Sequence, residues 1–192
     1  MTQAPISPEE ARQALALIET TTRQMRRALA HGGAPYFLMI WGTVWLVGFA
    51  ATHVLGPESP AVGGMWLVLD AIGALASFAV GAYLGRRAPS PRGMRLGLYW
   101  LVWTVYAALI LYFARPRTGD QLALLISLFA MMGYVSTGLL CRSRFLVGLG
   151  LAVTGLIVLG YVAWPAWFNL WMAVWGGGSL LTAGLYMRWA WS

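Results

Sequence analysis

The sequence is poor in the residue types that build catalytic and metal sites. It contains no lysine, one asparagine, one cysteine (Cys141) and two histidines (His31 and His53). A lone cysteine cannot form a disulfide within the chain, and no group of cysteine, histidine and acidic residues has the spacing of a metal site. The sequence also lacks a nucleophile motif and a phosphate-binding glycine loop. We therefore expect no catalytic residue, no metal and no cofactor, and we predict that the protein is not an enzyme.

Charged residues are scarce as well. They make up 10% of the 192 residues, whereas a soluble domain carries about 25%. Hydrophobic residues reach 59% and include eleven tryptophans, whose rings gather at membrane–water interfaces. This composition excludes an ordinary soluble domain and indicates an all-α, polytopic membrane protein. The net charge of +7 does not indicate nucleic-acid binding, because its arginines are placed as in a membrane protein.

The apolar residues fall into runs of membrane-spanning length. A helix needs roughly 20 apolar residues to cross a bilayer. Six stretches meet this requirement, at residues 35–55, 62–84, 94–114, 120–141, 145–163 and 167–187. Short segments rich in proline, glycine and arginine separate them. The sequence therefore predicts a six-helix transmembrane domain over residues 34–192, preceded by a cytoplasmic region over residues 1–33, which has no apolar core of a signal peptide.

Arginine distinguishes the two sides of this domain. Eleven of the thirteen arginines lie in the N-terminal segment, the second and fourth loops and the C-terminus, and only Arg115 and Arg117 lie in the third loop. Because cytoplasmic loops carry an excess of arginine, we predict that both termini are cytoplasmic, in the plasma (inner) membrane of a bacterium. The second, fourth and sixth spans also end alike, in GAYLGRR, GLLCRSR and GLYMRW, which favours three repeats of a helix hairpin.

Residues 7–31 have the pattern of an amphipathic helix. Ser7 and Glu10 have the spacing of a capping box, and Pro8 suits the first helical position. Apolar and small side chains then recur along one seam, at Ala11, Leu15, Ile18, Thr22, Met25 and Leu29. The helix could pack under its own membrane domain or on anionic lipid, pair with a second copy, or dock another protein. The candidate partner-binding residues are Leu15, Ile18, Met25 and Leu29.

One acidic residue, Asp70, lies inside the second expected span. An acid near the centre of a transmembrane helix costs about 2.5–3.5 kcal/mol on insertion scales, so a compensating partner is expected. Small residues on nearly the same face let two helices approach closely, and the candidate packing ladder is Gly73, Ser77, Gly81 and Gly85. We therefore expect Asp70 to face another helix rather than lipid.

The other five spans offer polar groups at the depth of Asp70. Together with Asp70 they form a candidate intramembrane polar site, which comprises Trp45, Thr104, Tyr106, Ser127, Thr154 and Trp175. Two interpretations of this site stay open. Asp70 holds helices together through hydrogen bonds, or it couples a proton or cation to the movement of a small solute.

The last expected span contains three consecutive glycines, in WGGGSLLTAG. Such glycines either break a helix and free carbonyl groups for binding, or mark close helix packing. A stripe of four tryptophans lies beside them, at Trp164, Trp167, Trp171 and Trp175. We expect the outer two to lie at the membrane interface, and the inner two to pack against helices or to line a ligand site.

Two functions follow from these features. The first is a non-catalytic regulatory, sensory or complex-assembly subunit, whose N-terminal helix engages a partner protein or a second copy and whose membrane part binds an apolar ligand. The second is a small-solute transporter or proton-coupled channel that uses Asp70. Expected contacts are the lipid bilayer and a homo-oligomeric, cytoplasmic or membrane protein partner, without nucleic acid.

Overall fold

The computed structural model describes residues 7–31, 33–87 and 91–190, without the side chains of Ile18, residues 21–31 and Arg92. Within these ranges the chain is helical and contains no strand. The first helix is α1 (Pro8–His31), and five longer apolar helices follow: α2 (Ala34–Leu55), α3 (Pro60–Arg87), α4 (Pro91–Ala114), α5 (Gly119–Leu140) and α6 (Arg144–Ala163). The chain ends in the short elements η1 (Pro165–Trp167), α7 (Phe168–Trp171), η2 (Met172–Gly177) and α8 (Gly178–Ala190).

Helices α2 to α6 are each long and apolar enough to cross a membrane. Their bounds agree with the first five predicted spans to within about the three residues by which helix ends are normally uncertain. Local signals explain several of these ends. Gly33 precedes α2 with φ of 89°, Thr118 accepts a hydrogen bond from the backbone of Gln121, and Ser143 accepts one from the backbone of Leu146. The protein is therefore a multi-pass, all-α membrane protein.

The sixth predicted span is not one α-helix. Residues 168–190 form a helical stretch in three parts, with the π-helical turn η2 between α7 and α8. The glycines of the sequence lie at this transition, and two of them press against α2. A Cβ atom added to Gly177 would lie 2.4 Å from the backbone nitrogen of Leu46. The predicted span over 167–187 thus corresponds to a helical stretch that changes type where its glycines contact α2.

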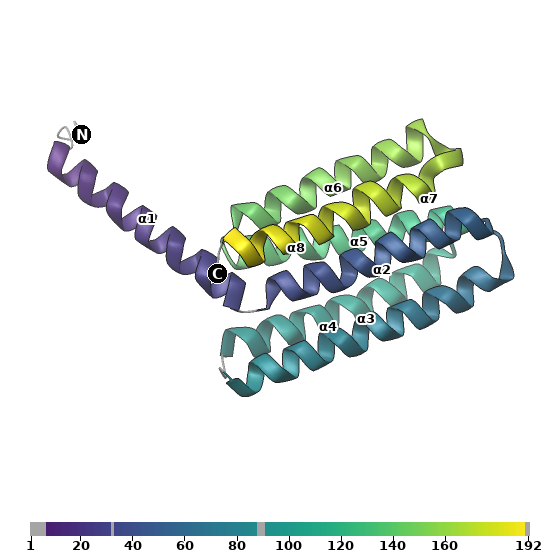
Figure 1. Ribbon diagram of the computed structural model, residues 1–192, viewed down its shortest axis with the longest axis horizontal. Coiled ribbons are helices and arrows are strands. Elements are labelled where there is room, and N and C mark those ends of the chain that lie inside the picture. The colour runs from purple at the N-terminus through teal and green to yellow at the C-terminus, as the bar shows by residue number, and fades with distance from the viewer. Residues whose placement is uncertain (1–6, 32, 88–90, 191–192) are drawn as a thin grey trace.

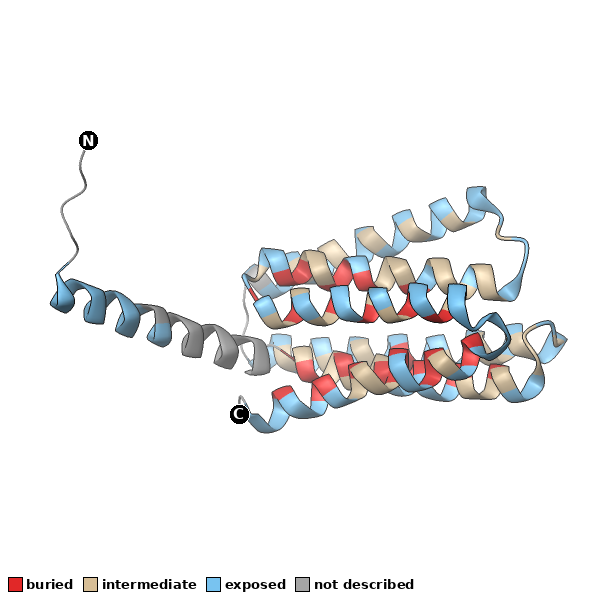
Figure 2. Ribbon diagram, turned by 90° about the horizontal axis from the view of Figure 1, so that it is seen from above, coloured by how far each residue is buried: buried red, intermediate tan, exposed pale blue. Residues whose placement is uncertain are grey.

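The bundle has two layers of three (Figures 1 and 2). The front layer in Figure 1 holds α3, α2 and the α7–α8 stretch, and the rear layer holds α4, α5 and α6. Within the layers, α2 packs against α3 and α8, and α5 packs against α4 and α6. The layers are joined where α6 contacts η2. Most buried apolar side chains come from α2, α5, α6 and the C-terminal stretch, and the largest include Leu38, Met131, Ile157, Phe168 and Leu180.

Helices α3 and α4 contribute little to this core (Figure 2). Gly73 is the one buried residue among those described in α3, and no described residue of α4 is buried. Aromatic side chains attach each of these helices to its neighbour in the same layer. Trp66 of α3 donates from Nε1 to Thr52 Oγ1 of α2 at 2.9 Å, and Trp100 of α4 packs edge-on against Tyr134 of α5.

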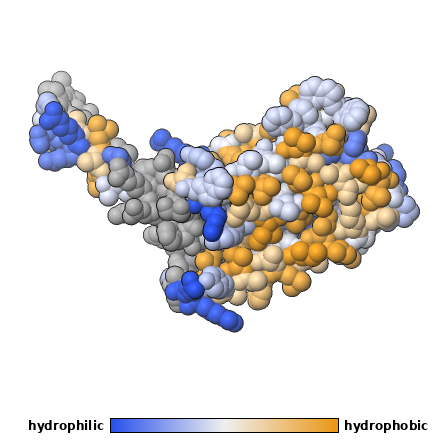
Figure 3. Space-filling view, in the orientation of Figure 1, coloured by the Kyte–Doolittle hydropathy of each residue, from blue (hydrophilic) through white to orange (hydrophobic). Residues whose placement is uncertain are grey.

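The two ends of the bundle differ in charge. The end from which α1 emerges also carries the C-terminal end of α3, the start of α4 and the turn between α5 and α6 (Figure 1). Eleven arginines belong to this end or to α1, whereas Arg115 and Arg117 lie at the opposite end. An apolar surface separates the two ends on the face drawn in Figure 3. We call the end from which α1 emerges the arginine-rich end, and the opposite end, which carries Arg115 and Arg117, the loop end.

Candidate functional site: the tryptophan groove

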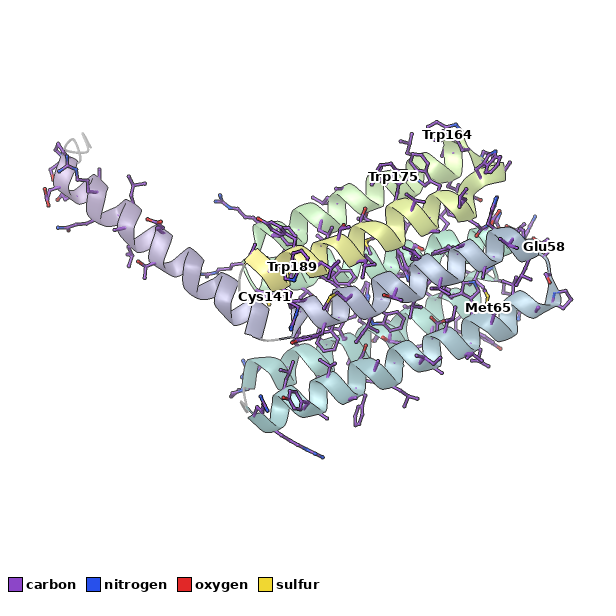
Figure 4. The ribbon with its side chains drawn as sticks, in the orientation of Figure 1. Glu58, Met65, Cys141, Trp164, Trp175 and Trp189 are labelled. Carbon is purple, nitrogen blue, oxygen red and sulfur yellow. The ribbon has the colours of Figure 1, made fainter. Side chains whose placement is uncertain are left out.

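A groove that begins directly after α6 and runs along η1, α7 and η2 is lined almost entirely by apolar side chains. Its lining residues are Trp164, Trp167, Leu170, Trp171, Val174 and Trp175, around a volume of about 290 Å³. The groove starts at the loop end and runs toward the middle of the bundle, as the positions of Trp164 and Trp175 show (Figure 4). We call it the tryptophan groove. Its walls offer aromatic faces and few polar atoms, which suits an apolar ligand.

Trp171 fixes the floor of the groove. Its Nε1 donates a hydrogen bond to the backbone oxygen of Leu156 at 2.8 Å. The ring also lies against Gly160, where an added Cβ atom would be 2.2 Å from Trp171 Cδ1. Glycine at position 160 is thus required for the indole to reach α6. Trp164 stacks on Trp171 with ring centroids 4.9 Å apart, and Trp175 follows at 5.8 Å.

The π-helical turn η2 carries one wall of this groove and also contacts α2. Val174 and Trp175 face the groove, whereas Gly176 and Gly177 are buried on the other side of the turn. Gly176 lies beside the Trp45 ring, and Gly177 lies against the backbone of Leu46. Single π-helical turns occur frequently at functional sites. The glycines of WGGG therefore serve close packing, as one of the two interpretations expected, while the outer side of the same turn shapes the groove.

A polar contact closes the loop end beside the groove. Asn169, buried in α7, donates from Nδ2 to Oδ1 of Asp120 in the first turn of α5 at 2.9 Å. The rings of His53 in α2 and Trp167 lie 5.3 Å apart, centroid to centroid. These contacts join α7 to α5 and η1 to α2. No local sequence pattern indicates the role of Asn169, although it is the one asparagine of the chain and lies near the end of a predicted span.

Asp70 lies on the surface of α3, where its side chain is exposed. No hydrogen bond or ion pair joins it to another side chain among the described residues. Of its small-residue ladder, Gly73 packs against Trp41 and Val44 of α2, and the Ser77 hydroxyl is buried. Gly81 and Gly85 have open space where a Cβ atom would lie. Within one chain, therefore, the ladder contacts α2 near Gly73, whereas Gly81 and Gly85 contact no other helix through their Cβ positions.

The structure does not gather the other members of the candidate polar site around Asp70. Thr104 and Thr154 each donate to a backbone oxygen of their own helix, at 2.8 and 2.7 Å. Tyr106 is exposed, and Trp175 belongs to the tryptophan groove. Trp45 and Ser127 are buried in the core, and the Ser127 hydroxyl has no hydrogen-bond partner among the described residues. These residues therefore lie in different surroundings: the core, the exposed surface and the tryptophan groove.

Helix α1 extends away from the bundle, and its main contacts with the bundle are made with α2 (Figure 1). The predicted capping box is confirmed: Ser7 N donates to Glu10 Oε2 at 2.9 Å, and Glu10 N donates to Ser7 Oγ at 3.2 Å. The hydrogen bonds from Ser7 lower the pKa of Glu10. Leu15, one of the four candidate partner-binding residues, is 66% exposed. The side chains of Ile18, Met25 and Leu29 lie outside the described part of the structure.

Comparisons with protein families, with curated proteins and with solved structures give no match for this chain.

Proposed function

We propose that the protein is a non-catalytic membrane subunit that regulates or assembles a complex, with α1 binding a partner protein or a second copy of the chain. The observation that carries this proposal is the position of α1, which extends from the arginine-rich end with Leu15 exposed. An apolar side chain such as Leu15 is exposed to water on this helix unless another surface covers it, and covering it is favourable.

We further propose a topology of six spans, in which the helical stretch 168–190 is the sixth. This stretch runs the length of the bundle beside α2 and ends at the arginine-rich end (Figure 1). Six spans put both termini on the same side of the membrane. The excess of arginine at that end makes it the cytoplasmic side, so that α1 meets its partner in the cytoplasm.

In this proposal the tryptophan groove is the sensing surface of the membrane part. An apolar molecule in the groove would contact η2, and η2 contacts α2, the helix that follows α1. A route of packed elements thus links the groove to the segment that carries the partner-binding helix.

Transport through Asp70 receives less support. A coupling group needs a water-filled path or a cluster of polar partners inside the bundle, and Asp70 lies on the outer surface of α3 without a partner side chain among the described residues. The residues expected to surround it are distributed over the core, the lipid-facing surface and the tryptophan groove.

Photo-cross-linking from α1 tests the proposed function. Benzoylphenylalanine is introduced at position 15, on the seam, and in a matched variant at position 17, where Leu17 is equally exposed at 70% but lies on the opposite face. We expect position 15 to give one discrete adduct in cell membranes and position 17 to give much less. Two differently tagged copies of the chain show whether the adduct is a homodimer. Equal labelling from both positions, or labelling of lipid alone from position 15, would contradict a protein-binding role for α1.

A further inference from the structure

A second groove lies at the loop end, where α4 turns into α5. Its lining residues are Ala114, Arg115, Pro116, Arg117, Gln121, Leu124 and Leu125, around a volume of about 400 Å³. Unlike the tryptophan groove, it combines two arginines with an apolar part. The other eleven arginines of the chain belong to α1 or to the arginine-rich end, so Arg115 and Arg117 are the two that lie at the loop end.

The backbone holds the two arginines in a defined turn. Arg115 has a left-handed conformation with φ of 47°, and its N–H donates to the oxygen of Leu111 at 3.1 Å. The N–H of Arg117 donates to Oε1 of Gln121 at 2.9 Å, which fixes the loop to the first turns of α5. Positive φ is uncommon in residues other than glycine, and the surrounding structure must hold the backbone in this conformation.

No acidic side chain neutralises these arginines among the described residues. Asp120 is the nearest acid in sequence, but its Oδ1 accepts the hydrogen bond from Asn169, which directs that oxygen toward α7. Among the residues that the structure describes, none forms an ion pair within 4.0 Å with Arg115 or Arg117. Two guanidinium groups at one groove match an oxyanion, because each presents several N–H donors in a planar arrangement.

The apolar part of the groove lies deeper than its charged part. Leu124 and Leu125 follow the start of α5 at Gly119 by five and six residues, which is about 8–9 Å along the helix at 1.5 Å per residue. A ligand that fills this groove therefore carries its negative charge at the end of the bundle and hydrocarbon toward the membrane interior.

We propose that this groove binds an anionic phospholipid, with its phosphate on Arg115 and Arg117 and its glycerol and upper acyl chain against Ala114, Leu124 and Leu125. The site is separate from the tryptophan groove and does not depend on the role of α1. The lipid would connect α4, which has no buried residue among those described, to α5.

The chain supplies a matched control for the charge. Arg142 and Arg144 have the same spacing at the opposite end, with Arg142 in the turn after α5 and Arg144 at the first position of α6, and Arg142 also has positive φ, at 52°. The double variants R115Q/R117Q and R142Q/R144Q thus remove equal charge from two comparable turns. The variant Leu125→Trp narrows the apolar part and leaves both arginines in place.

Native mass spectrometry of the full-length protein in detergent, with added phosphatidylglycerol or phosphatidylcholine of equal chain length, provides the test. We expect phosphatidylglycerol to bind the parent protein at least about ten-fold more tightly than phosphatidylcholine, a difference of about 1.4 kcal/mol. R115Q/R117Q should abolish that preference, Leu125→Trp should weaken binding of both lipids, and R142Q/R144Q should retain the preference.

Three results would overturn the proposal. Equal binding of the two lipids by the parent protein would exclude recognition of the anionic head group. Equal losses in the two double variants would mean that charge at either end attracts lipid without a built site. Displacement of phosphatidylglycerol by millimolar inorganic phosphate, with no effect of Leu125→Trp, would identify a soluble anion as the ligand instead.

Discussion

The contact between α2 and the C-terminal stretch yields a quantitative prediction, because two glycines bring the helices together backbone to backbone. A Cβ atom at Gly177 would lie 2.4 Å from the nitrogen of Leu46 and 2.9 Å from the oxygen of Gly42. Gly42 faces the same contact, with its Cβ position 2.5 Å from the nitrogen of Leu181. Ordinary contacts of a Cβ atom begin at 3.4 Å, so Gly177→Ala must separate the helices by about 1 Å.

A separation of this size weakens the whole interface. A gap of 0.5–1 Å forfeits roughly a quarter to a half of the dispersion energy of each contact, and overpacking costs typically about 1–3 kcal/mol. We expect Gly177→Ala to lower the free energy of unfolding by about 2–3 kcal/mol. Gly148→Ala is the matched control, since Gly148 of α6 has open space at its Cβ position. Because alanine favours a helix by about 1 kcal/mol over glycine, that variant should be unchanged or more stable.

Equilibrium unfolding in mixed micelles of dodecylmaltoside and sodium dodecyl sulfate, followed by tryptophan fluorescence, measures both variants. The combination of Gly42→Ala with Gly177→Ala should cost less than the sum of the two, because a single separation of the helices relieves both clashes. If Gly177→Ala unfolds at the same detergent fraction as Gly148→Ala, the backbone contact between α2 and η2 does not exist in the protein.

Three further predictions concern single contacts. Because the hydrogen bonds from Ser7 lower the pKa of Glu10, their stabilisation of α1 should be present at neutral pH and lost as the pH falls through that lowered pKa. Circular dichroism of a peptide spanning residues 5–31 should therefore show less helix at pH 2 than at pH 7, and Glu10→Ala should remove most of this dependence. Asn169→Ala leaves the Asp120 carboxylate without its donor and should cost about 1–3 kcal/mol in the same unfolding assay; no loss would mean that water replaces the amide. Trp171→Phe deletes the hydrogen bond to Leu156 and should destabilise by about 1 kcal/mol, whereas Trp175→Phe, at an exposed ring, should not.

The membrane spans could be predicted from the sequence because chain length and hydropathy alone determine them. Five helices match the predicted runs closely, and the capping box at Ser7 and Glu10 forms as its spacing indicates. These features depend on residues that are neighbours in the chain.

The directions of the side chains could not be predicted in the same way. A helix in lipid is apolar on every side, so the 3.6-residue periodicity that reveals the buried face of a soluble helix is weak. The exposure of Asp70 and the contact of Trp171 with Gly160 therefore became visible only in the folded chain. The hydrogen bond between Asp120 and Asn169 joins residues 49 positions apart, and no local pattern indicates it.

The π-helical turn was also beyond sequence reasoning. The glycines of WGGG indicated an irregularity or a close contact, and η2 combines both. The close contact depends on the backbone of Leu46 in α2, which lies 131 residues before Gly177 in the chain.

The mobility of a spin label on α1 in cell membranes tests the central claim most directly. With Cys141 replaced by serine, a nitroxide is attached at position 15 or at position 17. Both sites should be mobile in purified monomers, since Leu15 and Leu17 are 66% and 70% exposed. If α1 binds a protein partner through its seam, the label at position 15 should be immobilised in membranes and shielded from both oxygen and a water-soluble relaxant, while position 17 stays mobile. Equal mobility at the two positions, or oxygen accessibility at position 15 that indicates immersion in lipid, would contradict the account.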